Sequence, residues 1–172
     1  MGKVLAGFVL GIATLLIAGV CVTQLGLFPI DAKATPPAWE AALAGRAVAA
    51  SLARQAPHVA NPVAPTEANL LEGVKMFKDM CAGCHGDPNG ESVFGAGFYP
   101  KTPQFATAHP SKPDWQLYWI VKNGVRYTGM PSWEGLLGKT GDDKIWKMVS
   151  FLNHLDSLPP AVNEEWHKKP SQ

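Results

Sequence analysis

The pentapeptide Cys81-Ala82-Gly83-Cys84-His85 constrains this chain more strongly than any other feature of its sequence. Two thiols three positions apart in a tight turn can each form a thioether bond with a different vinyl group of one porphyrin. The histidine that follows directly is then placed to bind the iron. The pattern therefore predicts one covalently attached haem c, held by Cys81 and Cys84, with His85 as an axial ligand of the iron.

Other uses of a C-x-x-C pair fit the chain less well. A zinc site requires four ligands, and the remaining cysteine, Cys21, lies far away in an apolar segment. A thioredoxin-like pair follows a strand in a βαβ unit, whereas the flanks here have a helical pattern. A disulfide between Cys81 and Cys84 would close a very small loop. Haem attachment is therefore the preferred interpretation.

Met130 is the best placed of the five methionines to fill the sixth position on the iron. It lies between Gly129 and Pro131, in a loop that a glycine allows to bend and a proline stiffens. Its thioether can thus reach the iron without a helix in the way. The alternative is that Met130 only fills core space. Among the histidines, His109 is the strongest competing ligand; the others, interpreted as surface residues, are His58, His154 and His167.

Three segments together resemble those of a class I c-type cytochrome, over about residues 66 to 158. A helix with Gly73 and Phe77 leads into the pentapeptide, residues 129–133 are similar to the family's methionine loop, and the helix with Phe151 is similar to its C-terminal helix. The resemblance implies an all-α cytochrome c fold wrapped around one covalent haem. It also implies that Gly73 lets the first and last helices cross closely, with Phe151 packed beside it.

A proline carbonyl that accepts the Nδ1 proton of the haem histidine is a further implication of this resemblance. Pro100 and Pro103 both fit, and Pro103 is preferred. Such a bond fixes the imidazole ring and increases its donor strength. Independently, the side chains of Arg126, Tyr127 and Trp133 flank Met130 in the sequence and are candidates for contact with a haem propionate.

The segment from Val4 to Phe28 contains no charged residue and is long enough to cross a membrane as a helix. A retained signal-anchor is favoured over a signal cleaved after Ala34, because a cleavable signal has a shorter apolar region. Lys3 agrees with a cytoplasmic N-terminus. The expected location is therefore the cytoplasmic (inner) membrane, with a single span and the haem domain on the periplasmic side, where the family attaches its haem.

Four regions follow from the pattern along the chain. Residues 1–30 form the anchor, 31–65 a connector with an Ala-rich helix over Ala38–Gln55 and a Pro-rich linker, 66–160 the cytochrome c domain, and 161–172 a polar, loosely held tail. Thr66 is expected to cap the first helix of the domain and Asp114 a later one, which ends near Gly124.

The charge balance, 15 Lys and Arg against 14 Asp and Glu, gives no basic patch for nucleic acid. The preferred function is single-electron transfer, by an electron carrier or electron-transfer subunit rather than a stand-alone catalyst. The expected partners are a membrane oxidoreductase or subunits of a respiratory or photosynthetic complex, and a soluble electron carrier. The alternatives are a chiefly assembling subunit, and a peroxidase or sensor with an open iron.

Overall fold

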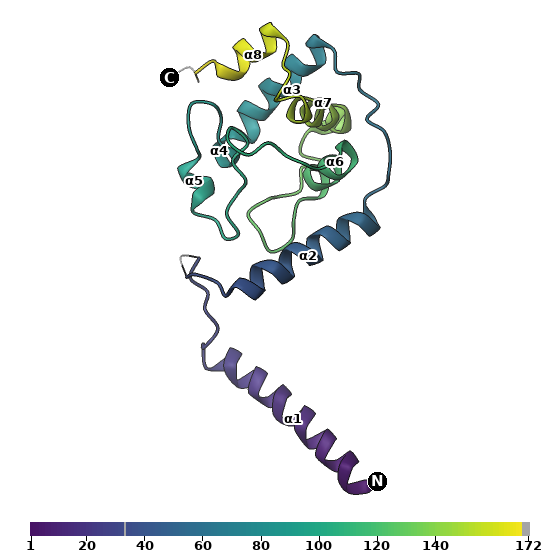
Figure 1. Cartoon of the computed structure of the whole chain (residues 1–172), viewed down its shortest axis with the longest axis vertical. Coiled ribbons are helices and arrows are strands. Elements are labelled where there is room, and N and C mark those ends of the chain that lie inside the picture. Colours follow the sequence, from purple (N-terminus) through teal and green to yellow (C-terminus); the bar gives the residue numbers. More distant parts are fainter. Residues whose placement is uncertain (33, 170–172) are drawn as a thin grey trace. The chain divides into compact units, whose positions relative to one another are not determined.

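The computed structural model describes residues 1–32 and 34–169, and every regular element in these ranges is a helix (Figure 1). The all-α prediction is therefore confirmed. The chain divides between Thr35 and Pro36 into two compact units, which are described separately below.

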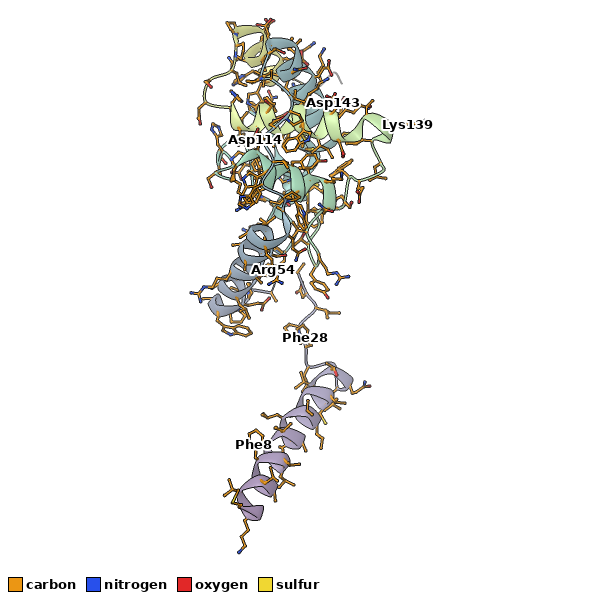
Figure 2. The ribbon with its side chains drawn as sticks, turned by 90° about the vertical axis from the view of Figure 1, so that its right-hand side faces the viewer. Phe8, Phe28, Arg54, Asp114, Lys139 and Asp143 are labelled. Atoms are coloured by element: carbon orange, nitrogen blue, oxygen red, sulfur yellow. The ribbon has the colours of Figure 1, made fainter. Side chains whose placement is uncertain are left out.

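The first unit is built on α1 (Gly2–Gln24), a helix of 23 residues with no buried side chain. At 1.5 Å per residue it is about 34 Å long, which exceeds the ~30 Å hydrocarbon core of a bilayer. Figure 2 shows apolar side chains along it, including that of Phe8. This is the one helix in the described part of the chain that is long and apolar enough to cross a membrane, and it supports single-pass anchoring. A signal sequence near the N-terminus can pass the same test of length and hydropathy.

The core of the second unit forms where α3 (Glu67–Met80) crosses α7 (Gly141–Asn153). A Cβ at Gly73 would collide with the Lys147 carbonyl oxygen and would lie 2.9 Å from Phe151 Cβ. The close helix crossing at Gly73, with Phe151 beside it, is therefore present as expected. Thr66 caps α3 as predicted, because its hydroxyl accepts a hydrogen bond from Asn69 N at 3.3 Å.

The helix α6 (Asp114–Asn123) packs against α7 and ends at Gly124, whose φ of +70° favours glycine. The prediction that Asp114 caps this helix is wrong: Pro113 is the N-cap residue, and Asp114 lies in the first turn. Its carboxylate instead accepts hydrogen bonds from Asn61 Nδ2, at 2.8 Å, and from Asn153 Nδ2. Asp114 thus joins the start of α6 to the Pro-rich segment that contains Asn61 and to the end of α7.

The Ala-rich helix α2 spans Ala38–Gln55, as the sequence predicts, and it belongs to the second unit. Its Leu52 is buried against the domain, where α2 contacts α6. The Pro-rich segment that follows is also packed down: the His58 ring stacks on Trp115 at 3.9 Å between centroids, and Asn61 Nδ2 lies 3.3 Å from the Trp146 carbonyl oxygen. The connector therefore continues into the cytochrome-like domain without a structural break at residue 65.

The expectation of a loosely held tail from residue 161 is wrong for the described residues. Pro160–His167 form α8, which starts with a proline in its first turn and packs on α3. Val162 and Trp166 are buried, and the Trp166 ring meets Phe77 edge-on at 5.5 Å and Phe151 at 5.2 Å. Val162 and Trp166 are four positions apart and so share one helix face. Most other residues of the segment are polar, so the sequence did not indicate that these two belong to the core.

Candidate haem-binding site

The predicted haem-attachment residues lie on one tight turn. Cys81 ends α3, and the short helix α4 (Ala82–His85) follows at once. The amides of Cys84 and His85 both donate to the Cys81 carbonyl oxygen, at 3.0 and 2.9 Å. This turn fixes two thiols and one imidazole relative to each other, and neither Cys81 nor Cys84 forms a disulfide.

The surroundings of Cys81 suit an uncharged sulfur. Burial, and in second place the nearby Cys84, raises the pKa of the Cys81 thiol to about 12. Its Sγ lies 3.5 Å from Met148 Sδ in the core. A thioether to a porphyrin stays neutral, whereas a zinc site needs thiolates. Among the described residues no group of three or more His, Cys, Asp or Glu is placed to hold a metal ion.

His85 presents one ring nitrogen in a fixed orientation. Its Nδ1 lies 2.8 Å from the Pro103 carbonyl oxygen, so of the two prolines that the sequence left open, Pro103 is the hydrogen-bond partner. Because a carbonyl can only accept, Nδ1 carries the proton and the lone pair is on Nε2. Burial lowers the pKa of His85, although the bond to Pro103 opposes this, and the ring stacks on Phe105 at 4.5 Å. A neutral, oriented imidazole is the form that binds iron.

Gln104 supports this turn from the loop after it, and the sequence reasoning missed it. Its Nε2 donates to the carbonyl oxygens of Cys84, at 3.0 Å, and Thr102, at 2.9 Å, while its Oε1 accepts from Ser92 N at 2.7 Å. A Cβ at Gly95 would collide with the same Cys84 carbonyl. No local pattern marks Gln104, because its partners are up to 20 residues away in the sequence.

The loop that carries Met130 is closed by its own hydrogen bonds. Val125 N donates to the Met130 carbonyl oxygen at 3.1 Å, Thr128 Oγ1 donates to the Val125 carbonyl oxygen at 2.7 Å, and Met130 N donates to Thr128 Oγ1 at 3.1 Å. Trp133 N then donates to the Val121 carbonyl oxygen at 3.2 Å and ties the loop to α6. The Thr128 hydroxyl thus donates one and accepts another of the hydrogen bonds that close the loop, and the sequence analysis missed this residue.

Two glycines let this loop come close to its neighbours. A Cβ at Gly124 would lie 2.6 Å from the backbone of Pro131, and one at Gly129 would lie 2.7 Å from the Phe98 ring. The Met130 side chain is half-buried and packs against the core. The methionine loop therefore meets the loop that follows α5 (Val93–Ala96), and α5 itself lies against the Cys84 carbonyl through Gly95.

The three residues considered for a propionate are placed differently. Trp133 is half-buried and packs against the core. Tyr127 is 91% exposed and adopts a φ of 61°, which is uncommon outside glycine. The exposed Arg126 guanidinium lies 5.7 Å from the centre of the Tyr127 ring. A contact of these three with a propionate stays a prediction.

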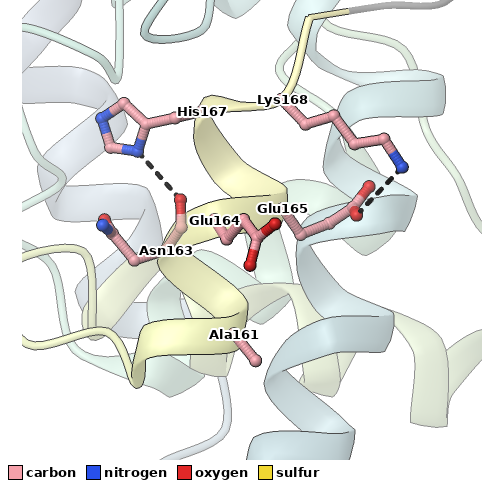
Figure 3. A pocket seen from close by; sticks show the side chains of 6 residues that line it. All are labelled: Ala161, Asn163, Glu164, Glu165, His167 and Lys168. Carbon is pink, nitrogen blue, oxygen red and sulfur yellow. Dashed lines mark hydrogen bonds and ion pairs between the residues drawn. The ribbon is translucent and has the colours of Figure 1, made fainter.

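The competing histidines make contacts elsewhere. His109 Nδ1 lies 2.7 Å from Asp156 Oδ1, and His154 Nδ1 lies 2.7 Å from the Ser150 carbonyl oxygen. Figure 3 shows His167 facing the Asn163 carbonyl oxygen on the surface of α8, at 2.9 Å. His58 stacks on Trp115, as described above. These contacts hold Nδ1 in His109, His154 and His167, as the Pro103 carbonyl does in His85, so the choice of His85 and Met130 as the two iron ligands stays a prediction.

Comparison with known proteins agrees with this reading of the site. Residues 68–152 match the family model described as cytochrome C oxidase, cbb3-type, subunit III. The matched segment runs from the start of α3 to the end of α7 and contains both the pentapeptide and the methionine loop. A search of the curated proteins finds no match. The match over residues 68–152 thus supports a class I c-type cytochrome domain in this chain, and such a domain implies haem binding.

Proposed function

We propose that this chain is a membrane-tethered monohaem cytochrome c that carries single electrons as a subunit of a respiratory oxidase complex. The cytochrome c domain and the family match support a haem-containing electron-transfer subunit. The observation that carries the proposal is the pairing of two rigid segments, one with Cys81, Cys84 and His85, the other with Met130.

The chain's residues have distinct roles in this proposal. Cys81 and Cys84 would bond the porphyrin covalently, and His85, through Nε2, and Met130, through its sulfur, would hold the iron. Haem c ligated in this way supplies a one-electron ferric–ferrous couple. The Pro103 carbonyl holds the His85 ring, and Thr128 holds the methionine loop. Both segments are thus closed by hydrogen bonds of the protein itself, which would hold the two side chains in place in either redox state of a bound haem.

In the proposal, the helix α1 anchors the chain in the membrane and so determines where the electron transfer takes place. It is retained as a single-pass anchor in the cytoplasmic membrane, with the second unit on the periplasmic side. Tethering keeps the haem domain close to membrane-embedded redox partners, chiefly subunits of the oxidase complex. The chain is near neutral and so provides little long-range electrostatic steering, which a tethered domain does not need.

The Met130→Ala variant tests the ligand set. We expect it to lose the near-infrared sulfur-to-iron band of the ferric protein and to have a lower reduction potential. The matched control is Met80→Ala, which removes a partly exposed methionine at the end of α3 and should leave both properties unchanged. An unchanged spectrum in Met130→Ala would remove Met130 from its role, and rapid carbon monoxide binding by the parent protein would favour an open-iron haem protein.

The attachment of the haem is tested on the same protein. The intact mass should exceed that of the polypeptide by one haem, and acidified acetone should leave the colour in the protein fraction. Purification from native membranes in mild detergent should yield the chain together with larger oxidase subunits. A colourless precipitate would contradict covalent attachment, and a lone monomer would contradict the role as a subunit.

A further inference from the structure

The outer face of α2 has no partner in the structure. We define this face by Trp39, Leu43, Arg46, Ala50, Ala53 and Arg54, which are all exposed; the first five follow one another three or four positions apart, and Arg54 lies four positions after Ala50. The opposite side of the helix, with Leu52, packs on the domain. The helix is therefore held on the domain by one side and presents the other outward.

The chemistry of the outer face is apolar and cationic. Trp39 and Leu43 are 66% and 61% exposed, and the only charged groups on the face are Arg46 and Arg54. Neither arginine makes an ion pair with a described residue. Glu40, the acidic residue of α2, is half-buried on a different side of the helix. Tryptophan, leucine and arginine without acidic neighbours are typical of a helix that lies in the interface of an anionic bilayer.

We infer that the outer face of α2 binds the surface of an anionic lipid bilayer, the same membrane that α1 spans in the proposed function. The segment between the two helices runs from Leu25 to Pro37, so even fully extended it reaches only about 45 Å. This tether confines α2 near the bilayer and gives the face a high effective concentration of lipid.

The position of the apolar side chains also fits a lipid partner. Trp39 and Leu43 lie in the first two turns of α2, the end nearest to α1 in the sequence, and Phe28 and Ile30 in the preceding segment are exposed as well. Exposed apolar side chains therefore occur on both sides of residues 31–37, at Phe28 and Ile30 before them and at Trp39 and Leu43 after them. Arg46 and Arg54 follow toward the other end, where long side chains can reach phosphate groups.

The size of the face argues against a second protein as the main partner. A helix of 18 residues is about 27 Å long and about 10 Å wide, which gives about 270 Å² for one face. Stable protein interfaces bury about 800 Å² on each partner. A tethered helix on a bilayer has no such threshold, because α1 already provides the attachment.

The test places a spin label at Ala50→Cys in the full-length holoprotein, with Cys21→Ser to remove the other free thiol. The protein is reconstituted in vesicles of phosphatidylcholine with a minority of phosphatidylglycerol. Collision rates with oxygen and with a water-soluble nickel chelate then report the depth of the label. The matched control is Lys144→Cys, an exposed position on α7. We expect the label at Ala50→Cys to collide several-fold less often with the chelate than the label at Lys144→Cys.

Charge reversal tests the electrostatic part. In Arg46→Glu/Arg54→Glu the protection of the label at Ala50→Cys should be lost, whereas Lys139→Glu/Lys144→Glu, with the same change in net charge, should retain it. Equal chelate access at the two label positions, with the protein still floating with the vesicles, overturns the inference and leaves the anchor intact. If the label at Ala50→Cys is protected from the chelate in native membranes but not in vesicles, the partner of the face is a protein and the inference is overturned. Failure to float with vesicles overturns both the anchor and the inference.

Discussion

Replacing Thr128 with valine isolates the hydrogen bonds that close the methionine loop. Valine keeps the shape and the branching at Cβ but removes the hydroxyl. Two hydrogen bonds disappear: the one from Thr128 Oγ1 to the Val125 carbonyl oxygen, at 2.7 Å, and the one from Met130 N to Thr128 Oγ1, at 3.1 Å. The bond from Val125 N to the Met130 carbonyl oxygen, at 3.1 Å, stays and keeps the fold of the loop.

The expected size of the effect follows from these two bonds. Each contributes about 0.5–1.5 kcal/mol net, so the closed loop loses about 1–3 kcal/mol relative to the open one. This free energy corresponds to about 5- to 150-fold in the opening equilibrium. The lower half of the range is expected, because Thr128 and Met130 are only half-buried and water can replace part of the lost bonding.

Imidazole binding to the ferric protein measures this equilibrium, because in the proposed ligand set imidazole reaches the iron only after Met130 leaves it. The apparent affinity for imidazole should increase by the same factor in Thr128→Val. Thr128→Ser keeps the hydroxyl and should bind imidazole like the parent. If the valine variant binds imidazole within twofold of the parent while its sulfur-to-iron band persists, the hydroxyl does not hold the loop and the reasoning is refuted.

Three further predictions concern the domain as a whole. Gly73→Ala should lower the free energy of unfolding by about 1–3 kcal/mol in denaturant titration, because the added Cβ meets the fixed backbone of α7, whereas Gly45→Ala, where nothing lies within 4 Å, should be neutral or stabilising. Trp166→Ala should cost about 3–5 kcal/mol in the same assay; an effect below ~1 kcal/mol would show that α8 is not part of the core. Hydrogen bonding from Lys122, and then from Tyr118, lowers the pKa of Asp142, so its stabilising effect is present above the unfolded pKa and is lost as the pH falls below about 4. Asp142→Asn should therefore flatten the acid limb of the stability curve slightly, and an unchanged limb would contradict the pairing.

The sequence predicts those parts of the site that depend on local spacing. The attachment turn is five consecutive residues, α2 covers the Ala-rich segment, and α3 begins after the Thr66 cap. Each of these features is decided by residues within a few turns of one another, which is the range over which sequence patterns carry information. The close crossing of α3 and α7 at Gly73 was instead implied by the resemblance to class I c-type cytochromes, because its partners in α7 are distant in the sequence.

The features that sequence analysis missed depend on distant partners. Gln104 bonds the backbone of Cys84, and Asp114 bonds Asn61 and Asn153, across 20 to 53 residues. The helix α8 looked like a polar tail because only Val162 and Trp166 face the core. A single buried face of two residues is too short a pattern to separate from chance, and only the packing of α8 on α3 gives it meaning.

The segment with His85 and the segment with Met130 form two halves of the candidate site, and different residues hold each half. One half can therefore open while the other stays in place. The His85 half is held by Pro103 and Gln104, while the Met130 half is held by Thr128 and by the end of α6. The close approach of Gly129 to the Phe98 ring joins the halves by packing, without a hydrogen bond through Gly129. A lesion in the methionine loop can therefore open that half while the thioether bonds and the His85 imidazole stay in place. Loss of the sulfur ligand should precede loss of the fold, because the α3–α7 crossing that supports the histidine half does not pass through the methionine loop.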